Sequence, residues 1–216
     1  MRITGKRISE STIHRLSLYF RSLEILEKEG YVTVSSKDLA QREKLTPAQV
    51  RKDLSFFGQF GTRGLGYPVV ELRQQIAEIL GINRKWNVAL IGIGNVGSAL
   101  VSFKEFIRQG FIIKLIFDND QRKIGSFNKG IEVHDVTNLR QMLNKHNIEL
   151  VIIAVPASVA QRIVDEVVDA GVKALLSFAP TNLRVPSNVT MRTVNMAIEM
   201  EHLSFHLTNE NLYYTA

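Results

Sequence analysis

The chain of 216 residues contains no cysteine. This absence excludes disulfides, thiolate nucleophiles and cysteine-ligated zinc sites, and it fits the reducing cytoplasm. No apolar run approaches the roughly 18 residues of a membrane span. The polar start MRITGKRISEST also lacks the apolar core of a signal peptide. We therefore expect a soluble, cytoplasmic protein with no membrane partner.

The C-terminal part of the chain has no excess of positive charge. Residues 1–85 hold fifteen Lys/Arg against nine Asp/Glu, whereas residues 86–216 hold twelve of each, so the net charge of +6 lies in the first part. A basic module joined to a neutral one suggests a polyanion partner for one module and a small ligand for the other. A basic solvated surface without a partner would give the same counts.

The basic part has a helix-turn-helix pattern. Helices are predicted at residues 11–30, 35–43 and 48–58, with Thr46 as the cap of the third and Pro47 in its first turn. Apolar residues share one face of the third helix, which leaves polar residues on the outside: Gln49, Arg51, Lys52 and Ser55. A helix of this kind fits the DNA major groove.

A glycine-rich segment follows, GQFGTRGLGYPV, with Arg63 and Gly64 at its centre. It is typical of a tight hairpin wing, in which glycines allow close approach to the DNA backbone and an arginine enters the minor groove. We predict a winged helix-turn-helix domain over residues 1–85. The alternative is a three-helix interaction domain with a solvated basic face.

The segment LIGIGNVGSAL carries a G-x-G-x-x-G fingerprint at Gly92, Gly94 and Gly97. It follows a predicted strand, opens a helix predicted to continue to Gly110, and is followed by a second strand that ends at Asp118. In this context the glycines form the turn, admit a pyrophosphate and allow helix and strand to pack. The sequence therefore predicts a dinucleotide site, although coenzyme A, another nucleotide or an empty Rossmann scaffold stay open.

An acid at the end of the second strand binds both ribose hydroxyls and repels a 2′-phosphate, so Asp118 favours NAD over NADP. The chain then repeats strand, helix and strand, with Ser158 predicted to cap the helix, and this predicts a doubly wound parallel sheet over residues 86–194. The candidate cofactor-binding residues are Gly92, Ile93, Gly94, Asn95, Val96, Gly97, Phe103, Asp118, Asn119, Lys123, Ala154, Val155, Pro156, Phe178, Ala179 and Pro180.

Residues 195–216 include a predicted helix with apolar residues around its whole surface. Such a helix must be buried on more than one side, so we infer that it packs into the partner chain of a homodimer. The alternative is a helix laid over its own sheet.

No histidine stands at a predicted strand end, where a dehydrogenase needs a proton donor or acceptor. Glu199, His202 and His206 have a helical spacing that could hold a metal, but a solvated or dimer-buried face is far commoner. Nucleotide binding without an evident catalytic group favours a sensor over an enzyme. An NAD-dependent oxidoreductase with an accessory domain is the rival hypothesis.

Seven segments resemble, in order, the redox-sensing transcriptional repressor Rex family: RLSLYFRSLEIL, SSKDLA, VRKDLSFFGQFGTRGLGY, IGIGNVGSAL, FDND with KIG, AVPASVAQ and LLSFAP. The resemblance covers nearly the whole chain. It implies a homodimer with a swapped terminal helix, which binds a palindromic operator in the NAD⁺ or apo state and releases it on binding NADH. It also implies DNA contacts by Arg51, Lys52, Ser55 and Arg63, and places Phe178 and Pro180 near the nicotinamide.

Two positions depart from the family pattern. Asn195 stands where many members have an aspartate that pairs with the arginine matching Arg15, and Phe103 stands where many have a tyrosine near the nicotinamide. A neutral amide weakens a charge-assisted contact and a phenyl ring lacks the hydroxyl. We therefore expect a weaker NADH-driven release from DNA than in typical members.

Overall fold

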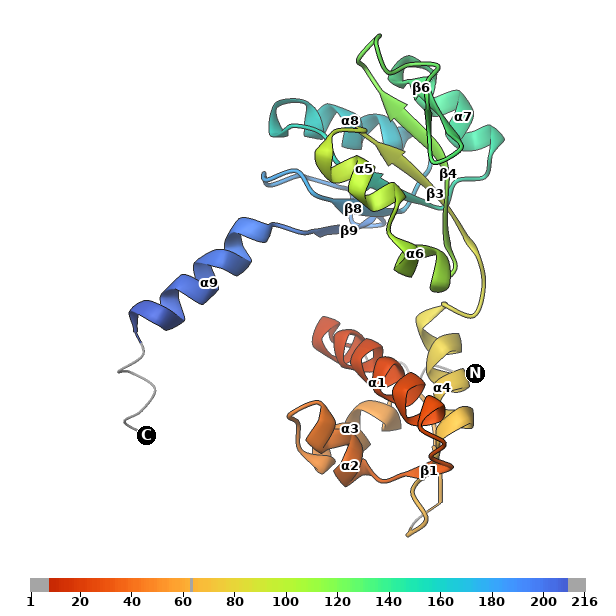
Figure 1. Ribbon diagram of the computed structural model, residues 1–216, viewed down its shortest axis with the longest axis vertical. Coiled ribbons are helices and arrows are strands. Elements are labelled where there is room, and N and C mark those ends of the chain that lie inside the picture. Colours follow the sequence, from red (N-terminus) through yellow and green to blue (C-terminus); the bar gives the residue numbers. More distant parts are fainter. Residues whose placement is uncertain (1–7, 63, 210–216) are drawn as a thin grey trace. The chain divides into compact units, whose positions relative to one another are not determined.

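The computed structural model describes residues 8–62 and 64–209, and the chain divides into two compact units between Arg84 and Lys85 (Figure 1). Among the residues described, no helix is long and apolar enough to cross a membrane. Residues 1–84 are called the N-terminal unit and residues 85–216 the C-terminal unit.

The N-terminal unit is a winged helix-turn-helix domain, as predicted. Its elements are α1 (Glu10–Lys28), β1 (Thr33–Val34), α2 (Ser36–Arg42), α3 (Pro47–Ser55), β2 (Tyr67–Pro68) and α4 (Val69–Leu80). α1 packs along α4, α2 contacts α3, and β1 pairs antiparallel with β2. The core is formed by buried apolar side chains from all four helices, among them Leu16, Leu23, Leu39, Val50, Leu54, Leu72 and Ile76.

Side-chain caps fix the start of both helices of the helix-turn-helix. The Ser35 hydroxyl accepts the Asp38 N–H at 3.1 Å and the Asp38 carboxylate accepts the Ser35 N–H, which forms a capping box. Thr46 accepts the Gln49 N–H at 3.2 Å, and Pro47 is the first residue of α3, as predicted. These caps explain why α2 and α3 begin within one residue of the predicted starts.

The C-terminal unit is built on a seven-stranded sheet in the order β5-β6-β4-β3-β7-β8-β9. All neighbours are parallel except the short edge pair β5·β6. Without β5, this is the usual Rossmann order of six parallel strands. The strands are β3 (Trp86–Ile91), β4 (Phe111–Asp118), β5 (Phe127–Asn128), β6 (Ile131–Asp135), β7 (Leu150–Ile153), β8 (Ala174–Ser177) and β9 (Thr190–Thr193).

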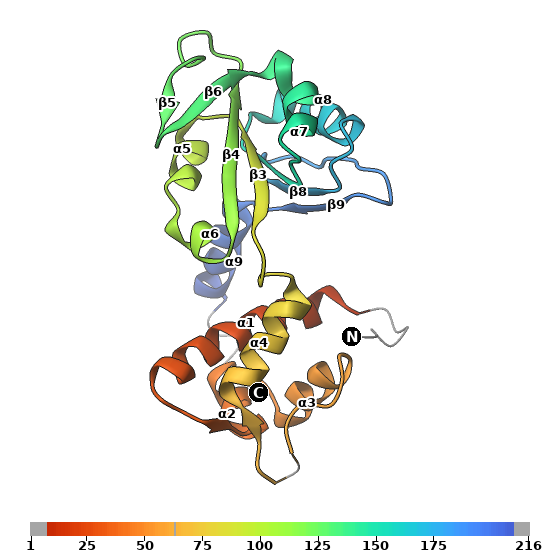
Figure 2. The same ribbon diagram turned by 90° about the vertical axis from the view of Figure 1, so that its right-hand side faces the viewer.

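Helices cover the sheet on both faces, as Figure 2 shows. α5 (Asn95–Val101) and α6 (Lys104–Arg108) lie on one face, while α7 (Leu139–Lys145), after the 3₁₀ turn η1 (Val136–Asn138), and α8 (Ala157–Asp169) lie on the other. The described segment between β8 and β9 contains no helix. An apolar hollow of about 340 Å³ is therefore open on the sheet surface, lined among others by Val88, Leu150, Ile152 and Leu176.

Two predictions for this unit were wrong. The single helix expected up to Gly110 is divided into α5 and α6, because Phe103 is extended (φ −77°, ψ 96°) and turns its ring onto Phe106. Ser158 does not cap α8: Pro156 takes the cap position with its fixed φ of −58°, so the helix begins at Ala157 and Ser158 lies within its first turn.

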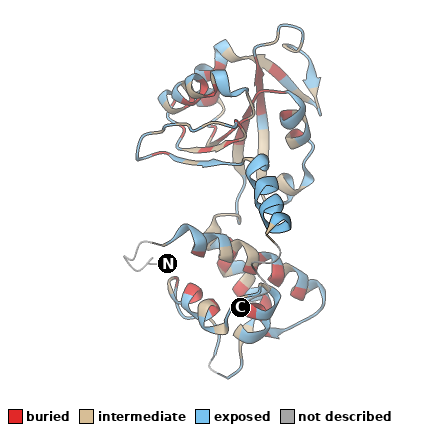
Figure 3. Ribbon diagram, turned by 90° about the vertical axis from the view of Figure 1, so that its left-hand side faces the viewer, coloured by how far each residue is buried: buried red, intermediate tan, exposed pale blue. Residues whose placement is uncertain are grey.

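The last described helix, α9 (Met196–Thr208), has no buried residue along its whole length (Figure 3). Its apolar side chains are exposed, with Met200 at 65% and Leu207 at 73%. Asn195 caps the helix by accepting the Ala197 N–H at 3.0 Å. The rest of the predicted terminal helix, residues 210–216, lies outside the described residues.

Candidate nucleotide cleft and DNA-binding surface

A cleft of about 350 Å³ opens at the carboxyl ends of β3, β4 and β7. Eight of the predicted cofactor residues line it: Gly92, Gly94, Asp118, Asn119, Lys123, Ala154, Val155 and Pro156. Ile91, Asp120, Val136, Val159, Arg162 and Ile163 also line it, and sequence reasoning did not select them. A ligand site at this edge, where the crossovers diverge to opposite faces, is the general rule for such sheets.

The three fingerprint glycines have different structural reasons. At Gly92 the backbone φ is +92°, and an added Cβ would lie 2.5 Å from the Ala154 carbonyl oxygen. At Gly97 a Cβ would lie 2.0 Å from the Gly92 carbonyl oxygen, so α5 can approach β3 only with a glycine there. At Gly94 a Cβ would meet nothing within 4 Å and would point into open space. The fold requires the first and third glycines, and the middle one leaves room for a ligand.

Asp118 is nearly buried at the end of β4 and is held from three sides. Its Oδ2 accepts the Ile93 N–H at 2.9 Å and lies 3.1 Å from Lys123 Nζ, and its Oδ1 accepts the Asp120 N–H at 2.9 Å. Burial raises the pKa of Asp118, but the two N–H donors and Lys123 outweigh it, so the pKa lies below the ordinary value. Asp118 is therefore an anion at neutral pH that braces the glycine loop.

The neighbouring cation Arg122 does not reach the cleft. Its guanidinium is paired with Asp120 at 2.8 Å and is largely exposed. This hydrogen-bonded pairing lowers the pKa of Asp120 to about 2. Arg162 of α8 is the cation that sequence reasoning missed: it lines the cleft and pairs with Glu166 at 3.1 Å. Its helix was predicted, but no motif marked which face would meet the ligand.

Other predicted cofactor residues lie elsewhere. Asn95 and Val96 begin α5, whereas Ile93, Gly97 and Ala179 are buried against the sheet, and Phe178 packs partly buried beside β7. Pro180 lies with Asn195 in a separate hollow of about 380 Å³, which also includes Thr193, Ile198 and Glu199. The structure thus brings together two residues that were selected for different reasons.

Phe103 does not line this cleft, and its expected place near the nicotinamide stays a prediction. The seven residues of α5, Asn95–Val101, lie between the glycine loop and Phe103. The Phe103 ring packs edge-on against Phe106 at 5.1 Å and lines a hollow together with Phe111 and Ile113.

The outer face of α3 carries three of the predicted DNA contacts. Arg51, Lys52 and Ser55 are exposed; the Arg51 guanidinium donates to the Ser36 hydroxyl at 3.0 Å, and the Ser55 hydroxyl donates to the Lys52 carbonyl at 2.7 Å. Gln49 was also expected outside, but its amide donates to the buried Asp53 carboxylate at 2.8 Å. Residues 49 and 53 are four positions apart and therefore share one face of α3. The Gln49 side chain is thus directed inward, toward Asp53.

The wing is a tight hairpin between α3 and α4. Thr62 forms an isolated antiparallel bridge with Gly66, and its N–H donates to the Gly66 carbonyl at 3.2 Å. Gly66 has φ +84°, and a Cβ there would lie 2.6 Å from the Val34 carbonyl oxygen, so β1 excludes any side chain. Gly64 is exposed with φ +88°. Arg63, the predicted minor-groove contact, lies outside the described residues.

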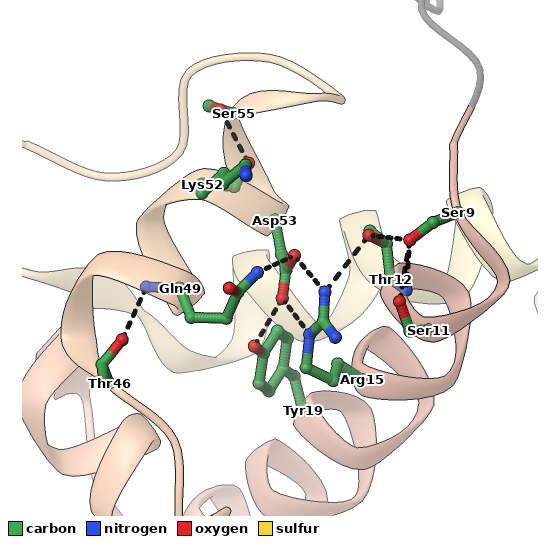
Figure 4. A network of polar contacts seen from close by, with 10 residues as sticks. All are labelled: Ser9, Ser11, Thr12, Arg15, Tyr19, Thr46, Gln49, Lys52, Asp53 and Ser55. Atoms are coloured by element: carbon green, nitrogen blue, oxygen red, sulfur yellow. Dashed lines mark hydrogen bonds and ion pairs between the residues drawn. The ribbon is translucent and has the colours of Figure 1, made fainter.

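Arg15 contacts α3 within its own unit. Its Nε lies 2.6 Å from Asp53 Oδ2, and this ion pair belongs to the network drawn in Figure 4. The partner that the family pattern suggested, at position 195, belongs to the other unit and is an amide engaged in capping α9.

A winged helix-turn-helix unit joined to a Rossmann unit with a glycine-loop cleft defines the class of nucleotide-responsive DNA-binding regulators. Comparisons with known proteins agree for each part. A family model described as a putative DNA-binding protein N-terminus matches residues 7–55, and one described as a CoA binding domain matches residues 83–181.

Relatives match over nearly the full length. The redox-sensing transcriptional repressor Rex of Desulfitobacterium hafniense is 47% identical over 93% of this chain and 96% of the relative. The Rex protein of Carboxydothermus hydrogenoformans is 47% identical over 95% and 99%. A crystal structure of RSP in complex with β-NAD⁺ and operator DNA is 35% identical with a TM-score of 0.92, and one of RSP with β-NADH is 33% identical with a TM-score of 0.88. The chain covers 97% of the first of these structures and 99% of the second, each over 97% of its own length.

The chain belongs to the Rex family of redox-sensing transcriptional repressors. This membership decides between the two functional hypotheses drawn from the sequence. The protein is a transcriptional regulator, and the oxidoreductase alternative is rejected, because the close relatives are repressors over their whole length.

Proposed function

We propose that this protein represses transcription by binding a palindromic operator in its NAD⁺-bound or apo form, and that NADH releases it. The observation that carries the proposal is the combination, in one chain, of an exposed basic face on α3 with the cleft between Gly94 and Asp118. The likeness to RSP, whose structures hold β-NAD⁺ with operator DNA and β-NADH, supports it.

In the cleft, NAD(H) binds with its pyrophosphate over Gly94 and against the amides at the start of α5. The adenosine ribose lies beside Asp118, where the anionic carboxylate disfavours a 2′-phosphate. The strand ends from Ala154 to Pro156 form the wall opposite Asp118, and the segment from Phe178 to Pro180 continues the same edge toward the nicotinamide. To act as a sensor, this cleft needs only to bind NAD(H) reversibly.

On the DNA side, α3 enters the major groove with Arg51, Lys52 and Ser55 outward, and the hairpin with Arg63 and Gly64 reaches the adjacent minor groove. Gln49 acts through Asp53 and not by direct contact, as its hydrogen bond supports. A palindromic site requires two copies of this unit related by twofold symmetry.

The homodimer is supported by two apolar surfaces of the C-terminal unit. α9 exposes large side chains along its whole length, and the hollow over β3, β7 and β8 is almost entirely apolar. Exposed patches of this kind mark interaction surfaces. We assign α9, within residues 195–216, to a swapped contact with the partner subunit. The protein acts in the cytoplasm, where it meets both DNA and NAD(H).

The NADH response is expected to be weaker than in members that carry an aspartate at position 195. Asn195 can still cap α9, but it offers no charge to an arginine. In the structure Arg15 is already paired with Asp53, so a neutral amide competes poorly for it. The position of Phe103 beside Phe106 gives this residue no support as a nicotinamide contact within its own chain.

The proposal is tested by measuring operator affinity in parallel titrations with NAD⁺ and NADH. The operator is the duplex that the parent protein enriches from a random-sequence library. Specific binding to a palindrome that weakens only with NADH is the expected result. Equal effects of both nucleotides would reject redox sensing, and no enriched palindrome would reject the repressor mechanism itself.

A further inference from the structure

The recognition helix α3 carries a buried carboxylate on its inner face. Asp53 is 0% exposed, although its neighbours Lys52 and Arg51 are on the surface. It shares the inner side of α3 with the core residues Val50 and Leu54, both of them buried. A buried charge is costly unless hydrogen bonds or ion pairs replace its lost hydration.

Four hydrogen bonds satisfy both carboxylate oxygens (Figure 4). Arg15 donates from Nε at 2.6 Å and from Nη2 at 2.7 Å, the Tyr19 hydroxyl donates at 2.8 Å, and the Gln49 amide donates at 2.8 Å. Three of these bonds come from α1 and one from α3 itself. Their fixed directions define both the rotation and the tilt of α3 against α1.

The network continues to the start of α1. Arg15 Nη2 also donates to the Thr12 hydroxyl at 3.3 Å, which is 2.9 Å from the hydroxyl of Ser9, the cap of α1. The bidentate hydrogen bond to Asp53 raises the pKa of Arg15, so the cation persists at every physiological pH. The arrangement is therefore a chain of directional contacts from the first turn of α1 to the last turn of α3.

Buried ion pairs contribute little net stability compared with well-packed apolar residues, but removing one partner is costly. Stability alone therefore does not explain why this helix carries a carboxylate inside. Orientation offers a reason, because the hydrogen bonds of Asp53 are directional, whereas the apolar contacts of Val50 and Leu54 are not. A small rotation would carry the side chains of Arg51 and Lys52 away from the bases they must meet.

We propose that Asp53 is a positioning residue for operator recognition: its contacts with Arg15, Tyr19 and Gln49 hold α3 in the one orientation that reads the operator. This inference rests on the proposed operator binding. Asp53 would thus support selectivity for the operator sequence, whereas the surface cations provide the affinity for any DNA duplex.

The test uses the full chain without nucleotide. The main variant replaces both partners by apolar residues, Arg15→Met with Asp53→Leu, which keeps the net charge unchanged and leaves no buried charge unpaired. The control is Ser22→Ala, which removes a buried hydroxyl of α1 whose hydrogen bond goes to Glu43, at the end of α2. A second variant, Tyr19→Phe, removes one donor to Asp53 while the ring stays in the core.

Three quantities are measured for each protein: the melting temperature, the affinities for the enriched operator and for a scrambled duplex, and the amide hydrogen exchange of α3 without DNA. For the double variant we expect a folded protein whose melting temperature is lowered by several degrees, because the buried Tyr19 hydroxyl loses its acceptor. We also expect operator selectivity lowered by at least about tenfold and unchanged affinity for the scrambled duplex. Exchange in α3 should rise. Tyr19→Phe should lower selectivity by roughly threefold, and Ser22→Ala should not change it.

A folded double variant with the selectivity of the parent would overturn the proposal. If the double variant does not fold, unchanged selectivity in Tyr19→Phe would overturn it as well. If the parent itself enriches no duplex, the proposed function fails, and the exchange measurement still decides the role of Asp53: no increase in α3 would show that the network does not hold this helix.

Discussion

Gly94 and Gly97 belong to one motif, yet the structure predicts opposite effects when each is replaced by alanine. Gly94 has φ −80° and ψ −159°, an extended conformation that alanine adopts without strain, and its added Cβ would point into free space. Gly94→Ala should leave the free energy of unfolding unchanged or raise it by up to about 1 kcal/mol. The methyl group would occupy the space that the cofactor pyrophosphate needs.

The size of the binding defect follows from the contacts that would be lost. Displacing the pyrophosphate from the amides at the start of α5 removes one charge-assisted hydrogen bond or more, each worth about 1.5–3 kcal/mol. The dissociation constant for NADH should therefore rise roughly 10- to 100-fold. The change in NADH fluorescence on binding measures it directly.

Gly97→Ala should act on the fold. Its Cβ would lie 2.0 Å from the Gly92 carbonyl oxygen, and neither backbone can yield without moving α5 from β3. Overpacking of this kind costs about 1–3 kcal/mol, which lowers the melting temperature by roughly 4–12 °C for a unit of this size. Scanning calorimetry provides the measurement. Normal NADH binding by Gly94→Ala, or a parent-like melting temperature for Gly97→Ala, would refute this division of roles.

Four further outcomes are expected. Asp118→Asn should lower the preference for NADH over NADPH by about tenfold, since the charge that repels a 2′-phosphate is lost; an unchanged ratio of the two dissociation constants would contradict this. Lys52→Ala should weaken operator binding and make the slope of log affinity against log salt shallower by about 1, whereas Lys145→Ala, on the other unit, should not. Asn195→Asp should lower the NADH concentration needed to release the operator, and a full response in the parent with no gain in the variant would refute the expected weakness. Asp53 has a pKa below its ordinary value of 3.8, because its hydrogen bonds, led by Arg15, outweigh burial. Its contribution to stability is thus present above that pH and lost on further acidification, so urea unfolding of Asp53→Asn should depend less on pH from about pH 5 downward than unfolding of the parent.

Much of the fold could be predicted because strong local signals coincide with it. The caps at Ser35 and Thr46, the apolar run that ends in Gly92 and the acid at the end of the next strand each mark an element locally. β5 and β9 carry no such signal: Phe127–Asn128 is too short for a pattern, and Thr190–Thr193 is a mostly exposed edge strand. The helix also divides at Phe103, where no glycine or proline marks the division in the sequence.

The site could be predicted only in part, for a related reason. Glycines and Asp118 have a fixed spacing that reports their role, whereas Arg162 reaches the cleft only because α8 crosses it. Asp53 stands in a polar helix, where a charge usually faces water, and nothing local reveals that Arg15, 38 residues away in the sequence, donates to it. Contacts between distant segments are the information that a single sequence does not carry.

We propose that NADH bound in the cleft beside Gly94 controls the binding of DNA by α3. The most direct measurement is the NADH concentration that releases half of the operator complex, for the parent and for Gly94→Ala at the same NAD⁺ concentration. The parent should release the operator as NADH rises, and Gly94→Ala should bind the operator normally but require a much higher NADH concentration. Release of both proteins at the same NADH concentration would contradict the claim.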